Sequence, residues 1–248
     1  MRGPIALPER PDLDDMIPVF ARSIGSWRLT LQRQPLSLPE LAGRYDRAAA
    51  GWSRTIERLN VPRAYEALMQ VALARSSLVG PGRQLRVLDC GVGTGALSCA
   101  LARVAGVPLR LDALDVSRRM LDRAGARFRT AGLHAGLHQA DARSLPFHDQ
   151  TFDIVMAAHL VEHLPDPERA LTEMVRVVRP GGLVVAFLTR RTALGLYVHL
   201  KWRTHMVSDT DAVAWLRKAG LQDVQPIVSG RRGVFRKLSM ACIGTKPG

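Results

Sequence analysis

The stretch Val87-Leu88-Asp89-Cys90-Gly91-Val92-Gly93-Thr94-Gly95 decides the fold of this chain. An apolar strand runs into an acidic residue, and glycines then occupy every second position. A helical pattern of apolar residues follows at once, from Ala96 to Val104. Strand, glycine turn and helix together predict a nucleotide-binding crossover, because glycine lets the backbone turn sharply and lets a flat ligand lie close to it.

The spacing of the glycines narrows the class of ligand. The pattern is G-x-G-x-G, whereas the turn that cradles a pyrophosphate is G-x-G-x-x-G, and no P-loop lysine follows. The sequence therefore predicts a ligand that carries a nucleoside but no phosphate chain.

Four further strands are predicted after the glycine turn. Leu111–Asp115 ends in a carboxylate about 20 residues past the last glycine, where an acidic side chain can hold a ribose diol. Gly136–Ala140 is followed by a second carboxylate, that of Asp141. Phe152–Ala158 is almost continuously apolar, which is typical of a buried parallel strand, and Leu183–Leu188 follows the turn Arg179-Pro180-Gly181-Gly182. Helices predicted at 96–105, 117–131 and 167–178 alternate with these strands, so the fold is a parallel sheet with helices on both faces.

Taken together, these segments resemble the class I S-adenosylmethionine-dependent methyltransferases. The similarity is carried by VLDCGVGTG at 87–95, LDVS with Met120-Leu121 at 114–121, ADARSLPFHDQTFDIV at 140–155 and HLVEHLPDPERALTEMVRVVRPGGLVV at 159–185. Within the superfamily, the chain is most similar to the branch that methylates small molecules and lipids. The resemblance implies a Rossmann-like, doubly wound, seven-stranded and mostly parallel sheet. In it, a late helix (Thr210–Ala219) precedes an antiparallel pair at Val224–Val228 and Leu238–Gly244.

The resemblance also implies S-adenosylmethionine as cofactor and a role for each matching residue. Asp89, Gly91, Gly93 and Gly95 would line its methionine and ribose part. Asp115, followed by Val116, would hold the ribose hydroxyls, and Met120 would pack on the adenine. The adenine amino group would donate to Asp141, beside Ala142, and Ala157 would complete the cofactor site. The candidate catalytic bases are His159 first, then His163 or Tyr45.

His159-Leu160-Val161-Glu162-His163 also matches H-x-x-E-H, the inverted zinc-protease motif. That motif needs one helix that presents both histidines, together with a further carboxylate. Here the segment follows a buried strand and is interrupted by Pro165, so the sequence favours a strand-end loop at an acceptor site and no metal. For His163, capping or packing is an equally good interpretation.

We expect three regions along the chain: a flexible tail over 1–15, an N-terminal helical cap over 16–80 and the cofactor-binding domain over 81–248. The cap would begin with a helix from Met16, because Ile17, Phe20, Ile24, Trp27 and Leu31 are spaced by three or four. Two more helices are predicted at 40–59 and 62–78. The apolar stripe from Ile17 to Leu31 fits either a packed helix or a membrane-binding one.

The charge of the chain predicts an anionic partner. The formal net charge is +13, and residues 181–248 carry eleven basic and three acidic side chains. The favoured acceptor is a small or amphiphilic molecule such as a lipid, with peripheral contact to an anionic membrane. RNA fits the charge less well, because the sequence shows no appended RNA-binding module and no Asn-Pro-Pro-Tyr-like motif. A catalytically silent S-adenosylmethionine-binding partner protein is the rival from another class.

The expected compartment is the cytoplasm. The sequence has no apolar run of about 18 residues, and its first 15 residues lack the apolar core of a signal peptide. The three cysteines form no C-x-x-C motif, which is typical of a reduced environment.

Overall fold

The computed structural model describes residues 17–33, 37, 39–40, 42–47, 61–192, 195–196, 199–200, 204–227 and 239–248. The tail predicted over 1–15 lies outside these ranges. Across them, no helix has both the length and the apolar character needed to cross a membrane.

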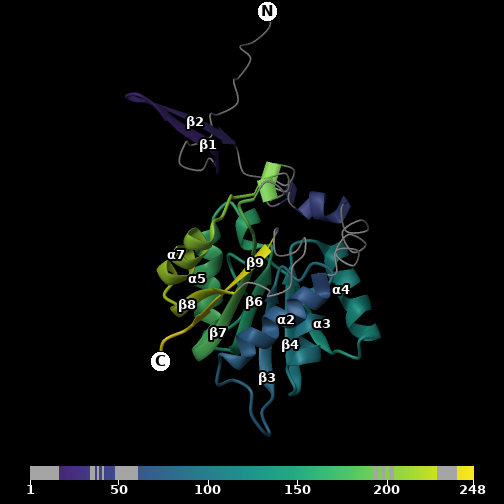
Figure 1. Cartoon of the computed structure of the whole chain (residues 1–248). Helices are drawn as coiled ribbons and strands as arrows, with labels where there is room; N and C mark the ends of the chain where they lie inside the picture. The colour runs from purple at the N-terminus through teal and green to yellow at the C-terminus, as the bar shows by residue number, and fades with distance from the viewer. Residues whose placement is uncertain are drawn as a thin grey trace, which may run out of the picture.

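A seven-stranded sheet forms the centre of the molecule (Figure 1). Its order is β5 (Ala135–Gln139), β4 (Leu109–Asp115), β3 (Leu85–Cys90), β6 (Phe152–Ala158), β7 (Val178–Thr189), β9 (Ser239–Thr245) and β8 (Gln222–Ile227). β3 pairs in parallel with β4 and β6, while β9 runs antiparallel to both of its neighbours. The predicted fold class, including the antiparallel pair at the end of the chain, is confirmed.

Helices cover both faces of this sheet. α2 (Val61–Ala74), α3 (Ala96–Val104) and α4 (Arg118–Thr130) contribute to one apolar cluster, while α5 (Pro167–Val177) and α7 (Asp209–Lys218) contribute to the other. Polar caps fix where these helices begin. The side chains of Ser117, Asp166 and Ser208 accept hydrogen bonds from the first turns of α4, α5 and α7. These caps fix the loops that precede the three helices.

The helix predicted from Met16 to Leu31 is wrong, because this segment forms an antiparallel hairpin of β1 (Ile17–Ile24) and β2 (Trp27–Arg33). Gly25 is the first residue of the two-residue turn and has a φ of +60°, which glycine adopts without strain. From Trp27 to Gln32 the residues alternate strictly between apolar and polar, the period of a strand. The helical prediction used only the apolar residues that lie three or four positions apart, and it left out Leu29.

The remainder of the predicted cap is helical where it is described. Residues 39–40 and 42–47 are helical, and the rest of the helix predicted at 40–59 lies outside the described residues. α2 confirms a helix near 62–78, but it belongs to the layer on the sheet: Tyr65 contacts Phe187 of β7 edge-to-face, with ring centroids 4.8 Å apart. The division of the chain at residue 80 remains a prediction.

Candidate functional site

The glycine turn follows β3 at the edge where the parallel strands end. Gly91, Gly93 and Gly95 all have a positive φ, between +52° and +78°. A Cβ atom at Gly91 would lie 2.9 Å from Leu160 Cδ1, and one at Gly95 would lie 2.7 Å from Phe128 Cε1. At Gly93 the nearest described atom would be 4.0 Å away, the carbonyl oxygen of Gly91. A side chain at either outer glycine would thus crowd a neighbour, whereas the described residues leave space at Gly93 that a ligand can enter.

Asp89 is the last residue but one of β3, two positions before Gly91, and it is buried. Its Oδ2 accepts a hydrogen bond of 2.5 Å from Ser98 Oγ. Its Oδ1 is buried too and has no hydrogen-bond partner among the described residues. Burial raises the pKa of Asp89 to about 7, although the bond from Ser98 opposes the rise. A buried acceptor without a donor at this place fits a ligand that brings one.

Asp115 ends β4 and ties the glycine turn to the next loop. Its carboxylate accepts hydrogen bonds of 2.9 Å from the backbone N–H groups of Gly93 and Ser117. Burial raises its pKa to about 6, and these two hydrogen bonds limit the rise. Ser117 Oγ in turn donates to Asp46, so the helical residues 42–47 are held against this edge of the sheet.

The other predicted cofactor residues lie around the same edge. Met120 lies in the first turn of α4, and it is buried like Ala142 and Ala157. Val116 follows Asp115, and its carbonyl accepts a hydrogen bond from Gln139. Asp141 is paired with Arg143, whose Nε and Nη2 lie 2.9–3.2 Å from its two carboxylate oxygens. An adenine amino group would therefore share Asp141 with this arginine.

His159 lies just past β6 in an unusual backbone conformation. Its φ is +52°, in a backbone region that residues other than glycine rarely adopt. The backbone is held by a 2.8 Å hydrogen bond from its N–H to the carbonyl of Phe187. Nδ1 lies 3.2 Å from Glu162 Oε1 and 3.1 Å from Thr189 Oγ1, and Nε2 lies 3.2 Å from Ser239 Oγ. Strain of this kind, fixed by several hydrogen bonds, is typical of functional sites.

Glu162 determines which nitrogen of His159 carries the proton. The carboxylate is fully buried and accepts from both the N–H and the hydroxyl of Thr189, at 2.9 and 3.0 Å. Burial alone would raise the pKa of Glu162, but the hydrogen bond and charge of His159 lower it to about 2. Because the carboxylate accepts and the Thr189 proton is already committed to it, Nδ1 must donate. Nε2 then keeps its lone pair and accepts from Ser239.

The other two catalytic candidates lie deeper. His163 is buried and contacts the ring of Tyr45, with centroids 5.7 Å apart. Burial lowers the pKa of His163 to about 4, although Glu162 opposes this shift. Burial raises the pKa of Tyr45 well above its ordinary value, and the charges of Asp115 and Glu162 raise it further. The site thus brings all three candidates together, and the imidazole of His159 is the one held by hydrogen bonds to Glu162, Thr189 and Ser239.

Comparison with known proteins agrees with this geometry. Residues 88–186, which include the glycine turn, both strand-end carboxylates and the His159 loop, match the family described as methyltransferase domain. Residues 88–186 therefore form a methyltransferase domain of the class I S-adenosylmethionine-dependent superfamily. S-adenosylmethionine is the cofactor of that superfamily.

Two curated methyltransferases illustrate the relationship. A phosphatidylethanolamine N-methyltransferase from Cereibacter sphaeroides is 47% identical over 103 residues, 40% of this chain and 48% of that protein. The ubiquinone/menaquinone biosynthesis C-methyltransferase UbiE from Vibrio vulnificus is 37% identical over 111 residues, 43% of this chain and 42% of that protein. The matched region spans about half the length of these relatives or less.

A solved structure extends the likeness to the fold of nearly the whole chain. It is the complex between the Haloferax volcanii Trm112 methyltransferase activator and a methyltransferase. The match has a TM-score of 0.64 and 22% identity, and covers 82% of this chain and 98% of that one.

Four polar side chains of the candidate site are not indicated by the sequence analysis. Ser98 and Ser117 lie at the starts of helices, next to the carboxylates predicted to bind the cofactor, a position that the strand-turn-helix pattern could have indicated. Thr189 and Ser239 come from β7 and β9 and meet His159 only in the folded sheet. Within the part of the chain that the structure describes, no group of three or more His, Cys, Asp or Glu side chains is arranged to hold a metal ion.

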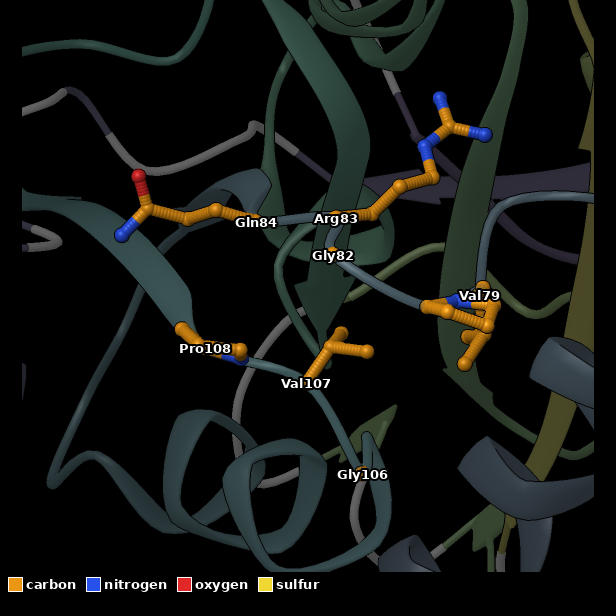
Figure 2. Close-up of a pocket in the computed structure, with 9 residues that line it drawn as sticks. Val79, Gly82, Arg83, Gln84, Gly106, Val107 and Pro108 are labelled. Carbon is orange, nitrogen blue, oxygen red and sulfur yellow. The ribbon is translucent and has the colours of Figure 1, made fainter.

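A separate hollow lies at the opposite edge of the sheet, before β3 and β4 begin (Figure 2). Val79, Val107 and Pro108 are among the residues that line it, while the side chains of Arg83 and Gln84 extend away from each other. Ligands of open α/β sheets bind at the carboxyl ends of the strands. The hollow is therefore separate from the candidate site around the glycine turn.

Proposed function

We propose that this protein transfers the methyl group of S-adenosylmethionine to a nucleophilic atom of an amphiphilic acceptor, with a phospholipid headgroup as the first choice. The observation that carries the proposal is the juxtaposition at one sheet edge of the open space at Gly93, the unpartnered oxygen of Asp89 and the oriented imidazole of His159. The phospholipid in the name of one relative and the basic last quarter of the chain support the choice of acceptor.

The residues present fit the cofactor. When bound, S-adenosylmethionine supplies an electrophilic methyl group on a positively charged sulfur. Asp89 Oδ1 would take its ammonium group, because this acceptor is buried and receives no hydrogen bond from the described residues. Asp115 would hold the ribose hydroxyls with the lone pairs that Gly93 and Ser117 leave free. Positioning and exclusion of water then supply much of the rate of methyl transfer.

The acceptor decides whether a base is needed. The amine of an ethanolamine headgroup is protonated near neutral pH and must lose that proton before it can attack. His159 Nε2 would receive it, because Glu162 and Thr189 keep the proton of the imidazole on Nδ1. Tyr45 stays protonated and His163 is only weakly basic, so both would shape the site rather than accept the proton.

A methyl-transfer assay tests the proposed acceptor. The chain is incubated with S-adenosylmethionine labelled on its methyl group and, separately, with phosphatidylethanolamine in detergent micelles, with a quinone precursor and with RNA. We expect label in the phospholipid, on nitrogen. Label in the quinone ring would show a carbon acceptor of the kind named for UbiE, and label in RNA would overturn the lipid assignment. Binding of the cofactor without label in any acceptor would favour the silent partner protein.

The pKa of Asp89 predicts how cofactor affinity depends on pH. Burial raises this pKa to about 7, so the carboxyl is neutral below pH 7 and attracts the cofactor ammonium less. Affinity should therefore rise with pH up to about 7.5, where an α-amino group is still largely charged, by at most about tenfold per pH unit.

Calorimetric titrations between pH 5.5 and pH 7.5 measure this dependence. Asp89→Asn is the matched variant: it should bind more weakly and lose the rise between about pH 6.5 and pH 7.5. A weaker dependence should persist nearer pH 6, where Asp115 titrates. An unchanged pH profile in Asp89→Asn would contradict the role given to Asp89.

A further inference from the structure

The β1–β2 hairpin separates its side chains into an apolar and a polar face. The register pairs Ile24 with Trp27, and Leu29 and Leu31 follow on alternate positions of β2, so these four residues share one face. Their exposed fractions are between 59% and 81%, highest for Trp27 beside the turn. The opposite face carries Ser23, Arg28, Thr30 and Gln32, which are polar and exposed.

This exposure is concentrated at one end of the molecule. The large apolar side chains that are exposed in the described ranges are Ile24, Trp27, Leu29, Leu31, Val79, Leu137, Leu196 and Leu200. Four belong to the hairpin, and two more belong to the segment after β7. Figure 1 shows the hairpin standing clear of the sheet, at the same end of the molecule as the segment around residue 200. Apolar groups gathered on a projecting arm are typical of an interaction site.

The charge of the hairpin indicates which kind of partner binds its apolar face. Residues 17–33 include Arg22, Arg28 and Arg33 and no aspartate or glutamate. Arg22 lies opposite Leu29, on the apolar face, where a long side chain can lay its stem on apolar groups and keep its charge in water. Tryptophan and arginine together favour the interface of a membrane, which offers acyl chains beneath anionic headgroups.

We propose that the β1–β2 hairpin is a docking arm that inserts its apolar face into the surface of an anionic phospholipid membrane. The Ile24–Trp27–Leu29–Leu31 face enters the headgroup region, and Arg22, which lies opposite Leu29 on the same face, contacts the phosphates. The net charge of +13 attracts the chain to such a surface over a longer range. This inference rests on the proposed lipid acceptor, which the arm would bring to the methyltransferase site.

Vesicle binding tests the arm. The full chain is sedimented with vesicles of phosphatidylcholine alone or mixed with phosphatidylglycerol, at increasing salt. We expect binding to the anionic vesicles that weakens as salt rises, and a blue shift of tryptophan fluorescence on binding. Trp27→Ser with Leu29→Ser should reduce binding by about tenfold or more and remove most of the blue shift, because both side chains are exposed and their loss leaves the core intact.

Variants on the other face provide the matched control. Thr30→Ser with Gln32→Ser should bind vesicles like the wild type, and all variants should keep the same thermal midpoint. Equal vesicle binding by Trp27→Ser/Leu29→Ser and wild type would overturn the proposal. So would a concentration-dependent dimer that only this variant loses, since the face would then bind a second copy.

The proposed acceptor and the proposed arm can fail separately. A wild-type chain that methylates phosphatidylethanolamine in micelles but does not bind anionic vesicles would refute the arm alone. A chain that binds vesicles through Trp27 and Leu29 but labels no phospholipid would refute the acceptor alone.

Discussion

His159→Asn should lower kcat by about 10²- to 10⁴-fold on a protonated amine acceptor, the range expected for loss of a general base. Asparagine suits this position for two reasons. It tolerates the positive φ of His159, and its amide nitrogen can still donate to Glu162 in place of Nδ1. Nε2 is lost together with its hydrogen bond to Ser239, so the affinity for S-adenosylmethionine should stay unchanged and the thermal midpoint should fall only slightly. Steady-state kinetics and calorimetry on the same preparation measure both effects.

Glu162→Gln separates positioning from proton transfer. The amide fits the same volume, but it can donate to His159 and no longer fixes the proton on Nδ1. We expect a smaller loss of kcat and a shifted pH profile, with His159 still required. If His159→Asn retains kcat within a few-fold, the acceptor attacks without help from this imidazole and its assignment as base is wrong.

Gly93→Asn should reduce the affinity for S-adenosylmethionine by about 100-fold or more, because its side chain would occupy the space in which the ligand approaches the backbone. The fold should survive, since asparagine tolerates a φ of +52° and the nearest atom to a Cβ here is 4.0 Å away. The N–H bond to Asp115 is kept as well. Calorimetry and thermal unfolding should show lost binding with a nearly unchanged midpoint.

Gly91→Ala is the matched control within the same turn. Its Cβ would meet Leu160 at 2.9 Å, and the residue would be held at a φ of +67°, so the fold itself should lose stability. We therefore expect opposite results: Gly93→Asn should lower the affinity for the cofactor, and Gly91→Ala should lower the stability of the fold. Wild-type affinity in Gly93→Asn would show that the ligand does not approach this turn.

The sheet could be predicted from the sequence because its signals are local. Nearly continuous apolar runs, as in Phe152–Ala158, predict buried parallel strands, and the glycine turn places the first of them. The hairpin was missed because a short apolar pattern fits two periods at once. In β2, Trp27, Leu29 and Leu31 alternate as in a strand, yet Trp27 and Leu31 are also four residues apart.

The candidate site was predictable only in part, because some of its contacts join residues that are distant in the sequence. Asp89 and Asp115 lie at the carboxyl ends of β3 and β4, and His159 directly follows β6, so the parallel arrangement of these strands brings all three to one edge. Thr189 and Ser239 are partners in the pairing of β7 with β9, and this pairing places both of them beside His159. The spacing of residues along the chain does not predict such a contact. The pairing of Asp141 with Arg143 likewise depends on how the loop after β5 directs the two side chains.

Calorimetric titration of the wild-type chain with S-adenosylmethionine and S-adenosylhomocysteine tests the assigned site most directly. Both ligands carry the same ribose, adenine and amino-acid groups, so both should bind at a single site per chain. Asp115→Ala should weaken both together, by roughly 1.5–3 kcal/mol for each charge-assisted hydrogen bond lost. Absence of binding for both ligands up to about 1 mM, the upper end of usual substrate affinities, would contradict the assignment. So would a loss in Asp115→Ala that affects only one of them.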